Sequence, residues 1–281
     1  MIAPLKRVLV RRPDTTFGNA DPATWHYAGK INLDIAQHEH DYFCDLLRRA
    51  GVEVIYHDIN LPKHADAIFT FDPTLMTRAG AILLNMGKPL RRGEEAAQGR
   101  IFEMLGIPIY AQLDGDARAE GGDTLWLDER TLAVGIGFRT NSEGARQLRE
   151  HLRPLGVDVL SYDLPYFTGP EACLHLLSLV SIVDETLAVA YPPLLPVRLW
   201  QELVRRGFRL IEAPQHEFEQ SQATNVLATK PGECIMLEGN PMTQQRLIEA
   251  GCEVQTYRGY ELSFKAEGGA TCLTRPILRE E

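Results

Sequence analysis

The sequence of 281 residues has no long apolar run, few cysteines and no excess of basic charge. Its longest apolar stretch, from Leu174 to Val183, is interrupted by His175 and is far shorter than a membrane span. The five cysteines lack C-x-x-C spacing, which argues against a disulfide framework or a zinc site. A net charge of −9 argues against a nucleic-acid-binding surface. With no signal-peptide pattern before Arg7, we expect a soluble cytoplasmic protein without membrane or nucleic-acid partners.

The chain also lacks a linker rich in glycine, serine and proline, so we expect one domain over residues 1–281. With 44% apolar and 24% charged residues, this domain can bury a substantial core. What the chain does contain is a short phrase that recurs five times: a helical segment, a glycine that stops it, and a strand-like alternation. The repeat glycines are spaced 55, 50, 51 and 44 residues apart and are Gly51, Gly106, Gly156, Gly207 and Gly251. The repeat predicts five α/β modules.

Polar and reactive side chains occupy a similar position in every module. They lie 14 to 21 residues after the repeat glycine and are Asp66 and Asp72, Glu120, His175, Asn225 and Cys272. If the modules surround a common axis, these carboxylates, imidazole, amide and thiol meet at that axis. The repeat therefore predicts an active site at the centre of a ring.

Local patterns predict most of the helices and strands of such a ring. Strands are expected at residues 6–11, 53–57, 81–85, 124–127, 131–135, 186–191, 233–237 and 273–277. Helices are expected at residues 34–50, 92–105, 199–206 and 243–250, and from a cap at Asn141 to Leu152. The last strand needs a partner, and we expect the first strand to pair with it and close the ring.

Two reactive residues follow or precede paired glycines. Cys272 follows Gly268 and Gly269, which allow the backbone to approach a ligand closely. A free cysteine is more often a small buried hydrophobe, and that interpretation is kept for the four other cysteines, Cys44, Cys173, Cys234 and Cys252. Glu120-Gly-Gly-Asp123 would alone be read as a turn. Because both glycine-flanked segments fall at equivalent module positions, we interpret Cys272 and Glu120 as parts of the predicted site.

The histidines and arginines support more than one interpretation. His175 interrupts an apolar segment, where a histidine is usually a core residue, but it falls at the polar module position. His38 and His40 lie two residues apart on a predicted helix and point to different faces, so no metal site is expected there. Arg91 and Arg139 would by default be solvated charges. Arg139, however, precedes a helix start, where anionic groups are commonly held.

Several of these segments together match a known family. They are Asp66 with Phe69 and Asp72-Pro, Arg91-Arg92-Gly-Glu, Glu120-Gly-Gly-Asp123, Arg139-Thr-Asn-Ser-Glu-Gly-Ala-Arg, Leu174-His175-Leu and Gly268-Gly-Ala-Thr-Cys272. In this order and spacing, between about residues 6 and 277, the chain resembles the bacterial dimethylarginine dimethylaminohydrolases. The resemblance implies a guanidino-modifying enzyme with the five-module β/α propeller (pentein) fold and pseudo-five-fold symmetry.

The resemblance also implies a catalytic set of Cys272, His175 and Glu120. Cys272 would attack the guanidino carbon, and His175 would act as general acid and base, while Glu120 and Asp72 would hold the guanidinium. A covalent thiouronium intermediate would form and water would release a ureido product, without a metal or organic cofactor. The implied reaction is hydrolysis of N-methylated L-arginine to L-citrulline and methylamine or dimethylamine.

At the other end of the substrate, the resemblance implies that Asp66, Arg91 and Arg139 bind the α-amino and α-carboxylate groups of a small guanidino amino acid. The chain departs from the family at Phe71, where a second acid is common, and in the segment of residues 15–30, which contains Trp25 and is expected to lie over the substrate. We expect Phe71 to leave room for an apolar N-substituent.

Alternatives from two classes share this scaffold. An arginine deiminase or arginine dihydrolase would act on unmethylated arginine, and an amidinotransferase would pass the amidino group to a second amine. A ribosome-binding anti-association factor would be a binding protein without a nucleophile, as would an inactive relative. Cys272, His175 and Glu120 together, with the acidic charge, favour an enzyme. The sequence does not specify the oligomeric state, and a homodimer is among the arrangements it allows.

Overall fold

The computed structural model describes residues 2–171 and 174–280 and consists of short strands and helices. The strands are β1 (Leu5–Val10), β2 (Glu53–Tyr56), β3 (Thr74–Thr77), β4 (Gly80–Leu83), β5 (Ile109–Gln112), β6 (Thr124–Asp128), β7 (Thr131–Ile136), β8 (Asp158–Asp163), β9 (Val180–Asp184), β10 (Leu187–Ala190), β11 (Arg209–Glu212), β12 (Val226–Lys230), β13 (Glu233–Leu237), β14 (Glu253–Tyr257) and β15 (Arg275–Arg279). The α-helices are α1 (Thr15–Gly18), α2 (Pro22–Trp25), α3 (Leu33–Arg49), α4 (Glu94–Met104), α5 (Ser142–Leu152), α6 (Val197–Arg205), α7 (Gln215–Ser221) and α8 (Pro241–Glu249).

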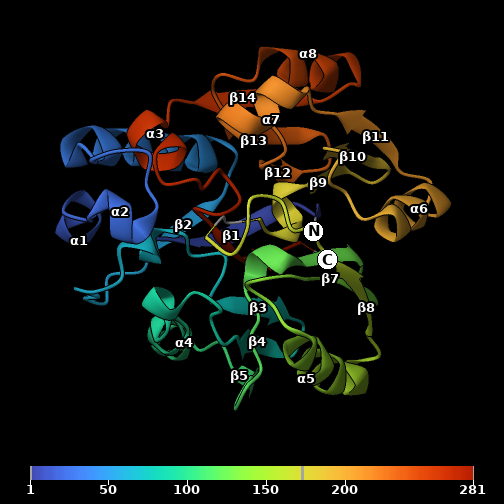
Figure 1. The fold of residues 1–281 in the computed structure, drawn as a ribbon, viewed down its shortest axis with the longest axis horizontal. Helices are drawn as coiled ribbons and strands as arrows, with labels where there is room; N and C mark the ends of the chain where they lie inside the picture. Colours follow the sequence, from blue (N-terminus) through green and yellow to red (C-terminus); the bar gives the residue numbers. More distant parts are fainter. Residues whose placement is uncertain (1, 172–173, 281) are drawn as a thin grey trace.

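These strands form five three-stranded sheets with one plan (Figure 1). In each sheet the middle strand pairs antiparallel with one neighbour and parallel with the other, and a helix connects the parallel pair. The sheets are β15-β1-β2, β3-β4-β5, β6-β7-β8, β9-β10-β11 and β12-β13-β14. Figure 1 shows them around a common centre with the longer helices on the outside, so the predicted five α/β modules are confirmed.

The repeat glycines end the outer helices as the sequence predicts. Their φ angles are 79° at Gly51, 72° at Gly106, 70° at Gly156, 86° at Gly207 and 98° at Gly251. This left-handed conformation disfavours side chains with a Cβ atom, which explains why glycine recurs at each helix end. The chain then turns directly into the parallel strand of the module.

The longer helix that joins the parallel strands of a module packs its apolar face on that module's sheet. In the third module, Leu148 and Leu152 of α5 are fully buried against Leu132 and Val134 of β7. The strands are too short to form a sheet that is stable alone, so this burial holds each module together. In the described part of the chain, no helix combines the length and apolar character that crossing a membrane requires.

The first and last strands close the ring. β15 pairs antiparallel with β1, and the Arg279 side chain donates to the carbonyl of Ala3 at 2.6 Å. The predicted pairing is therefore confirmed. The last strand begins at Arg275, two residues later than predicted, because residues 269–274 form tight turns in which Leu273 N–H donates to the Gly269 carbonyl.

Some elements differ from the sequence prediction. The polar segment before α3 contains two one-turn helices, α1 and α2, whose first turns are capped by Asp14 and Asp21. The strands β3, β9 and β12, which lie nearest the centre of the ring in Figure 1, and the short helix α7 were not predicted. Each of these strands pairs with the middle strand that follows it in the chain, and this pairing specifies it.

Candidate active site

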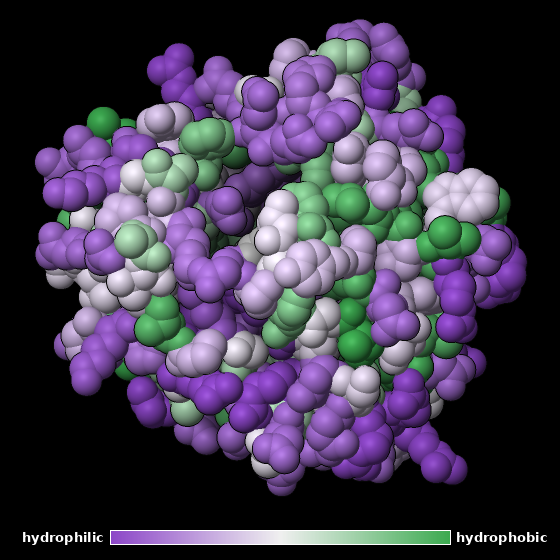
Figure 2. Space-filling model, viewed as in Figure 1, coloured by the Kyte–Doolittle hydropathy of each residue, from purple (hydrophilic) through white to green (hydrophobic). Residues whose placement is uncertain are grey.

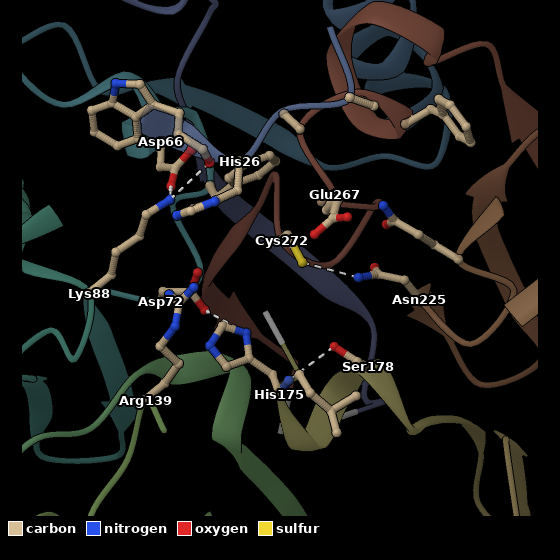
Figure 3. A pocket seen from close by; sticks show the side chains of 18 of the residues that line it. His26, Asp66, Asp72, Lys88, Arg139, His175, Ser178, Asn225, Glu267 and Cys272 are labelled. Carbon is tan, nitrogen blue, oxygen red and sulfur yellow. Dashed lines mark hydrogen bonds and ion pairs between the residues drawn. The ribbon is translucent and has the colours of Figure 1, made fainter. Parts of the chain in front are cut away.

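A cavity of about 250 Å³ opens near the centre of the ring. Figure 2 shows this face hollowed near its middle, with hydrophilic side chains along one side of the opening. The segments that enter each module's hairpin supply the walls. Figure 3 shows Asp66, Asp72, Arg139, His175, Asn225 and Cys272, which all line this cavity. Arg91 also lines it. The structure thus brings together the side chains that the repeat places at equivalent positions.

Glu120 lies behind the cavity wall and holds His175. Its side chain is fully buried, and Oε2 is 2.8 Å from Nε2 of His175 and 3.2 Å from an Arg139 nitrogen. The backbone N–H of Lys88 donates to Oε1 at 2.9 Å. Burial alone would raise the pKa of Glu120, but the charge of Arg139 and the contact with His175 outweigh it and lower the pKa well below its usual range. Glu120 is therefore ionised and orients the imidazole.

Asp72 faces the other side of the same imidazole. Its Oδ1 accepts the Gly122 N–H at 2.9 Å and lies 3.9 Å from Nδ1 of His175, while Oδ2 accepts from Arg91 at 2.6 Å. A Cβ atom on Gly122 would lie 2.3 Å from Nδ1 of His175. The close approach of backbone to imidazole explains the second glycine of Glu120-Gly-Gly-Asp123.

Asp123 supports the same region from outside the cavity. One carboxylate oxygen accepts from the Thr140 hydroxyl at 2.6 Å, and the other accepts from the Leu176 N–H at 3.0 Å. Leu176 directly follows His175, so Asp123 ties the histidine segment to the neighbouring module. Burial raises the pKa of Asp123 to about 6.

Arg91 is bound to protein groups on every side-chain nitrogen. Beside its contact with Asp72, Nε and one terminal nitrogen pair with Glu94, and the same terminal nitrogen donates to the Phe69 carbonyl at 2.9 Å. The side chain is 3% exposed. In this geometry, Arg91 holds the Asp72 carboxylate in place.

At the far end of the cavity, Asp66 lies in a cluster that sequence reasoning identified only in part. Tyr27 donates to its Oδ1 at 2.7 Å, and Lys88 Nζ lies 2.6 Å from its Oδ2 (Figure 3). Lys88 also donates to the Trp25 carbonyl and lies over the Trp25 ring, 4.9 Å from its centroid. A signal for Lys88 existed, because it lies three residues before Arg91 in the same loop after β4.

Cys272 is placed by Asn225. The Thr271 N–H donates to Oδ1 of Asn225 at 2.9 Å, which turns the amide nitrogen toward Cys272 Sγ at 3.0 Å (Figure 3). A Cβ atom on Gly269 would lie 2.6 Å from Cγ of Asn225, so this glycine leaves room for the amide. An N–H donor beside sulfur stabilises its anionic form. The sequence placed Asn225 in the site but did not assign it this contact.

The other described cysteines are buried as predicted. Cys44, Cys234 and Cys252 are free thiols inside the core, and burial raises the pKa of Cys44 to about 11. Cys173 lies outside the described residues. Among the described cysteines, Cys272 is the partly exposed one.

The segment of residues 15–30 and Phe71, at which the sequence departs from the family, lie in different places relative to the cavity. Residues of the 15–30 segment, Trp25, His26 and Ala28, line the cavity, as expected for a segment lying over the substrate. Phe71 is buried instead, with the Arg275 guanidinium 3.8 Å from its ring centre, while Phe69 lines the cavity. Phe71 therefore does not shape the space in which a substituent would lie.

Metal-ligating atoms also meet in this site. One ligand atom from each of Asp72, Glu120 and His175 lies within 4.8 Å of the others. Arg91 and Arg139 already bring positive charge to the two carboxylates. This charge opposes a cation at the same point.

His40 of the His38-Glu-His40 segment is buried in α3 beside Cys44, and burial lowers the pKa of His40 to about 4.

Comparison with known proteins gives consistent matches. The family model described as N,N dimethylarginine dimethylhydrolase, eukaryotic, matches residues 7–279. The uncharacterized protein YkgA of Bacillus subtilis is 30% identical over 253 residues, which cover 89% of this chain and 83% of YkgA. An arginine deiminase of Listeria welshimeri is 27% identical over 253 residues, covering 75% of this chain and 61% of the deiminase.

Solved structures share the fold. A mutant of the dimethylarginine dimethylaminohydrolase from Pseudomonas aeruginosa, complexed with citrulline, matches with a TM-score of 0.78 at 22% identity and covers 96% of this chain and 98% of that chain. The product-bound N-terminal domain of ArgZ, an arginine dihydrolase from cyanobacteria, matches with a TM-score of 0.82 at 22% identity, covering 97% of each chain. The predicted five-module propeller is confirmed by these matches.

Proposed function

The chain belongs to the N,N dimethylarginine dimethylhydrolase family, and from that premise we propose that it hydrolyses the guanidino group of a small guanidino acid through a covalent intermediate on Cys272. The observation that carries this proposal is the arrangement of one cavity. It combines a thiol beside an amide donor, an imidazole fixed by a buried carboxylate, and a second carboxylate that faces the imidazole.

The residues suit the difficulty of the reaction. A guanidinium is a weak electrophile because its charge is delocalised, so it must be held rigidly and attacked by a strong nucleophile. Asp72 can hold its N–H groups by charge-assisted hydrogen bonds. Arg91 keeps Asp72 in place, and the Asn225 amide favours the thiolate of Cys272. Glu120, which the resemblance assigned to the guanidinium together with Asp72, lies one layer deeper and acts through His175 instead.

The proposed reaction has two halves. The Cys272 thiolate attacks the guanidino carbon, and the C–N bond to the departing amine breaks as His175 supplies a proton to that nitrogen. Glu120 holds Nε2 of His175, and the Nδ1 side of the ring faces Asp72, so the imidazole lies beside the guanidinium that Asp72 would hold. Water then gives a proton back to His175 and attacks the same carbon. The C–S bond breaks, and a ureido product and the thiolate result.

The substrate side has two candidates. The family resemblance predicts N-methylated L-arginine, with L-citrulline and a methylamine as products. Unmethylated arginine is the second candidate, because Phe71 lies outside the cavity and so does not provide the room for a methyl group that we expected from it. The similarity to an arginine deiminase supports the same candidate.

A matched substrate series tests the proposal. The protein is incubated with dimethylated L-arginine, L-arginine, 4-guanidinobutyrate and agmatine, and both the ureido product and the released amine are measured. We expect equal amounts of the two products from at least one substrate, a mass adduct on Cys272 during turnover, and neither with Cys272→Ser. Turnover by Cys272→Ser, or no product and no adduct with any of the four, would overturn the proposal.

A further inference from the structure

One cation in the cavity wall has no part in the mechanism above. Lys88 extends from the loop after β4, its side chain is 11% exposed, and its ammonium has three partners. These are Asp66 at 2.6 Å, the Trp25 carbonyl at 3.3 Å and the Trp25 ring. Most lysines are exposed and solvated, so a lysine with three partners inside a cavity has a fixed position and places its charge there.

Lys88 changes what Asp66 can do. The sequence resemblance assigns Asp66 to the α-ammonium of an amino-acid substrate, but both of its oxygens already accept hydrogen bonds, from Tyr27 and from Lys88. Burial, and then the charge of Asp66, raise the pKa of Tyr27 well above its usual value, so Tyr27 remains a donor. The charge of Asp66 is balanced by Lys88. An incoming ammonium would have to compete with a cation that belongs to the protein.

Lys88 is better placed than Arg91 to bind an anionic substrate group. Each side-chain nitrogen of Arg91 is bound to protein oxygens, whereas the ammonium of Lys88 has three N–H groups for the two oxygens that it contacts, which leaves one for a further acceptor in the cavity. Burial raises the pKa of Glu267, another cavity acid, and Lys88 contributes most among the charges that oppose this rise. Lys88 thus provides the positive charge of this end of the cavity, with Arg139 nearer His175 (Figure 3).

We propose that Lys88 occupies the place of a substrate α-ammonium on Asp66 and binds the substrate carboxylate, so that the enzyme acts on ω-guanidino carboxylic acids without an α-amino group. This inference rests on the proposed guanidino hydrolysis and names its substrate class. A guanidino group at one end and a carboxylate at the other satisfy Asp72 and Lys88. The α-amino group of arginine adds a positive charge where the protein already has one.

The test compares kcat/KM for 4-guanidinobutyrate with that for L-arginine and for dimethylated L-arginine, in the unaltered protein and in Lys88→Met. We expect 4-guanidinobutyrate to be preferred at least tenfold over both amino acids. In Lys88→Met, Asp66 loses its internal cation, so this ratio should fall at least a hundredfold and L-arginine should gain in absolute terms. The backbone N–H of Lys88 that holds Glu120 is unchanged by this substitution.

Two further variants sharpen the test. Arg92→Met, in the same loop but outside the cavity wall, should keep the preference of the unaltered protein. Lys88→Arg keeps the charge and should keep the sign of the preference. A tenfold or larger preference for either amino acid in the unaltered protein overturns the inference, as does an unchanged ratio in Lys88→Met, while guanidino hydrolysis still stands. Absence of ureido product from every substrate overturns the proposed function instead.

Discussion

At the scale of single residues, the candidate site contains two reactive groups, the thiol of Cys272 and the imidazole of His175. Each is oriented by a partner side chain. Asn225 gives Cys272 an N–H donor, and Glu120 gives His175 a buried negative charge. Neither partner is expected to touch the reacting carbon. Both nevertheless orient the reactive group and interact with its charge.

Replacing Asn225 by aspartate isolates its donor role. Asn225→Asp keeps an oxygen for the Thr271 N–H but puts a negative charge beside the sulfur in place of the amide donor. We expect the pH at which half of Cys272 reacts with iodoacetamide to rise by at least one unit and turnover to fall about a hundredfold. The alkylation rate is followed against pH by peptide mass spectrometry, with Cys272→Ser as the blank. An unchanged pH profile would show that Asn225 only packs against the sulfur.

Asp123 makes a prediction about stability and pH. Its pKa of about 6 in the folded protein lies above the ordinary value of 3.8, because the carboxyl is buried. The folded state therefore keeps its proton longer than the unfolded state. The stability this gives is fully present below pH 3.8 and is lost as the pH rises through 6.

The variant Asp123→Asn removes that titration and can keep contacts with Leu176 and Thr140. Relative to the unaltered protein, its free energy of unfolding should increase by about 2 to 3 kcal/mol between pH 4 and pH 7. Urea unfolding at several pH values measures this difference, in which the other titrating groups cancel. A difference independent of pH would mean that folding leaves the pKa of Asp123 unchanged.

Many residues that line the cavity could be predicted to lie together, because the repeat aligns them and because glycines flank Glu120 and Cys272. The partners of Asp66 could not be predicted in the same way. Tyr27 is 39 residues away along the chain, and Lys88, although it lies three residues before Arg91, carries no local pattern that pairs it with Asp66. Whether Asp66 faces a substrate or a lysine depends on how two separate loops fold toward each other.

At the scale of elements, the hairpin entry turns decide where the side chains lie. The sequence predicted the outer helices and parallel strands, since the glycine stop and the apolar periodicity are local. It did not predict β3, β9 and β12, because these strands are specified by pairing with the next strand. These are the strands that follow the site residues.

The entry turn before β6 allows a direct test. In Gly122→Ala the added Cβ would lie 2.3 Å from Nδ1 of His175, so either the imidazole or the turn must move. We expect turnover to fall at least a hundredfold while the Tm falls only a few degrees. Gly29→Ala is the matched control, because its Cβ would meet nothing closer than a Lys265 carbon at 4.0 Å. Full activity in Gly122→Ala would show that this close packing is not needed.

At the scale of the whole molecule, five similar modules form one closed ring. In such a ring, the chain could in principle begin at any of the modules. The β15-β1 pairing joins the last module to the first, and the Glu280 N–H donates to the Pro4 carbonyl at 2.8 Å. Figure 1 shows both chain ends side by side near the centre of the view. Closure was predictable from the need of an edge strand for a partner. The sequence could not predict which of the two faces of the ring carries the cavity, because that depends on which turns converge.

If ring closure rather than chain order holds the site together, the ring can be opened elsewhere. A circular permutant joins the two ends by about six glycine and serine residues and begins at Arg130, in the exposed turn between β6 and β7, away from the cavity. We expect one cooperative unfolding transition and turnover within about threefold of the unaltered protein. Deleting residues 275–281 removes β15, leaves β1 with an unpaired edge and releases the segment that carries Cys272, so this variant should lose turnover and cooperative unfolding. An inactive permutant beside an active truncation would show that the order of the modules, and not the closed ring, determines the site.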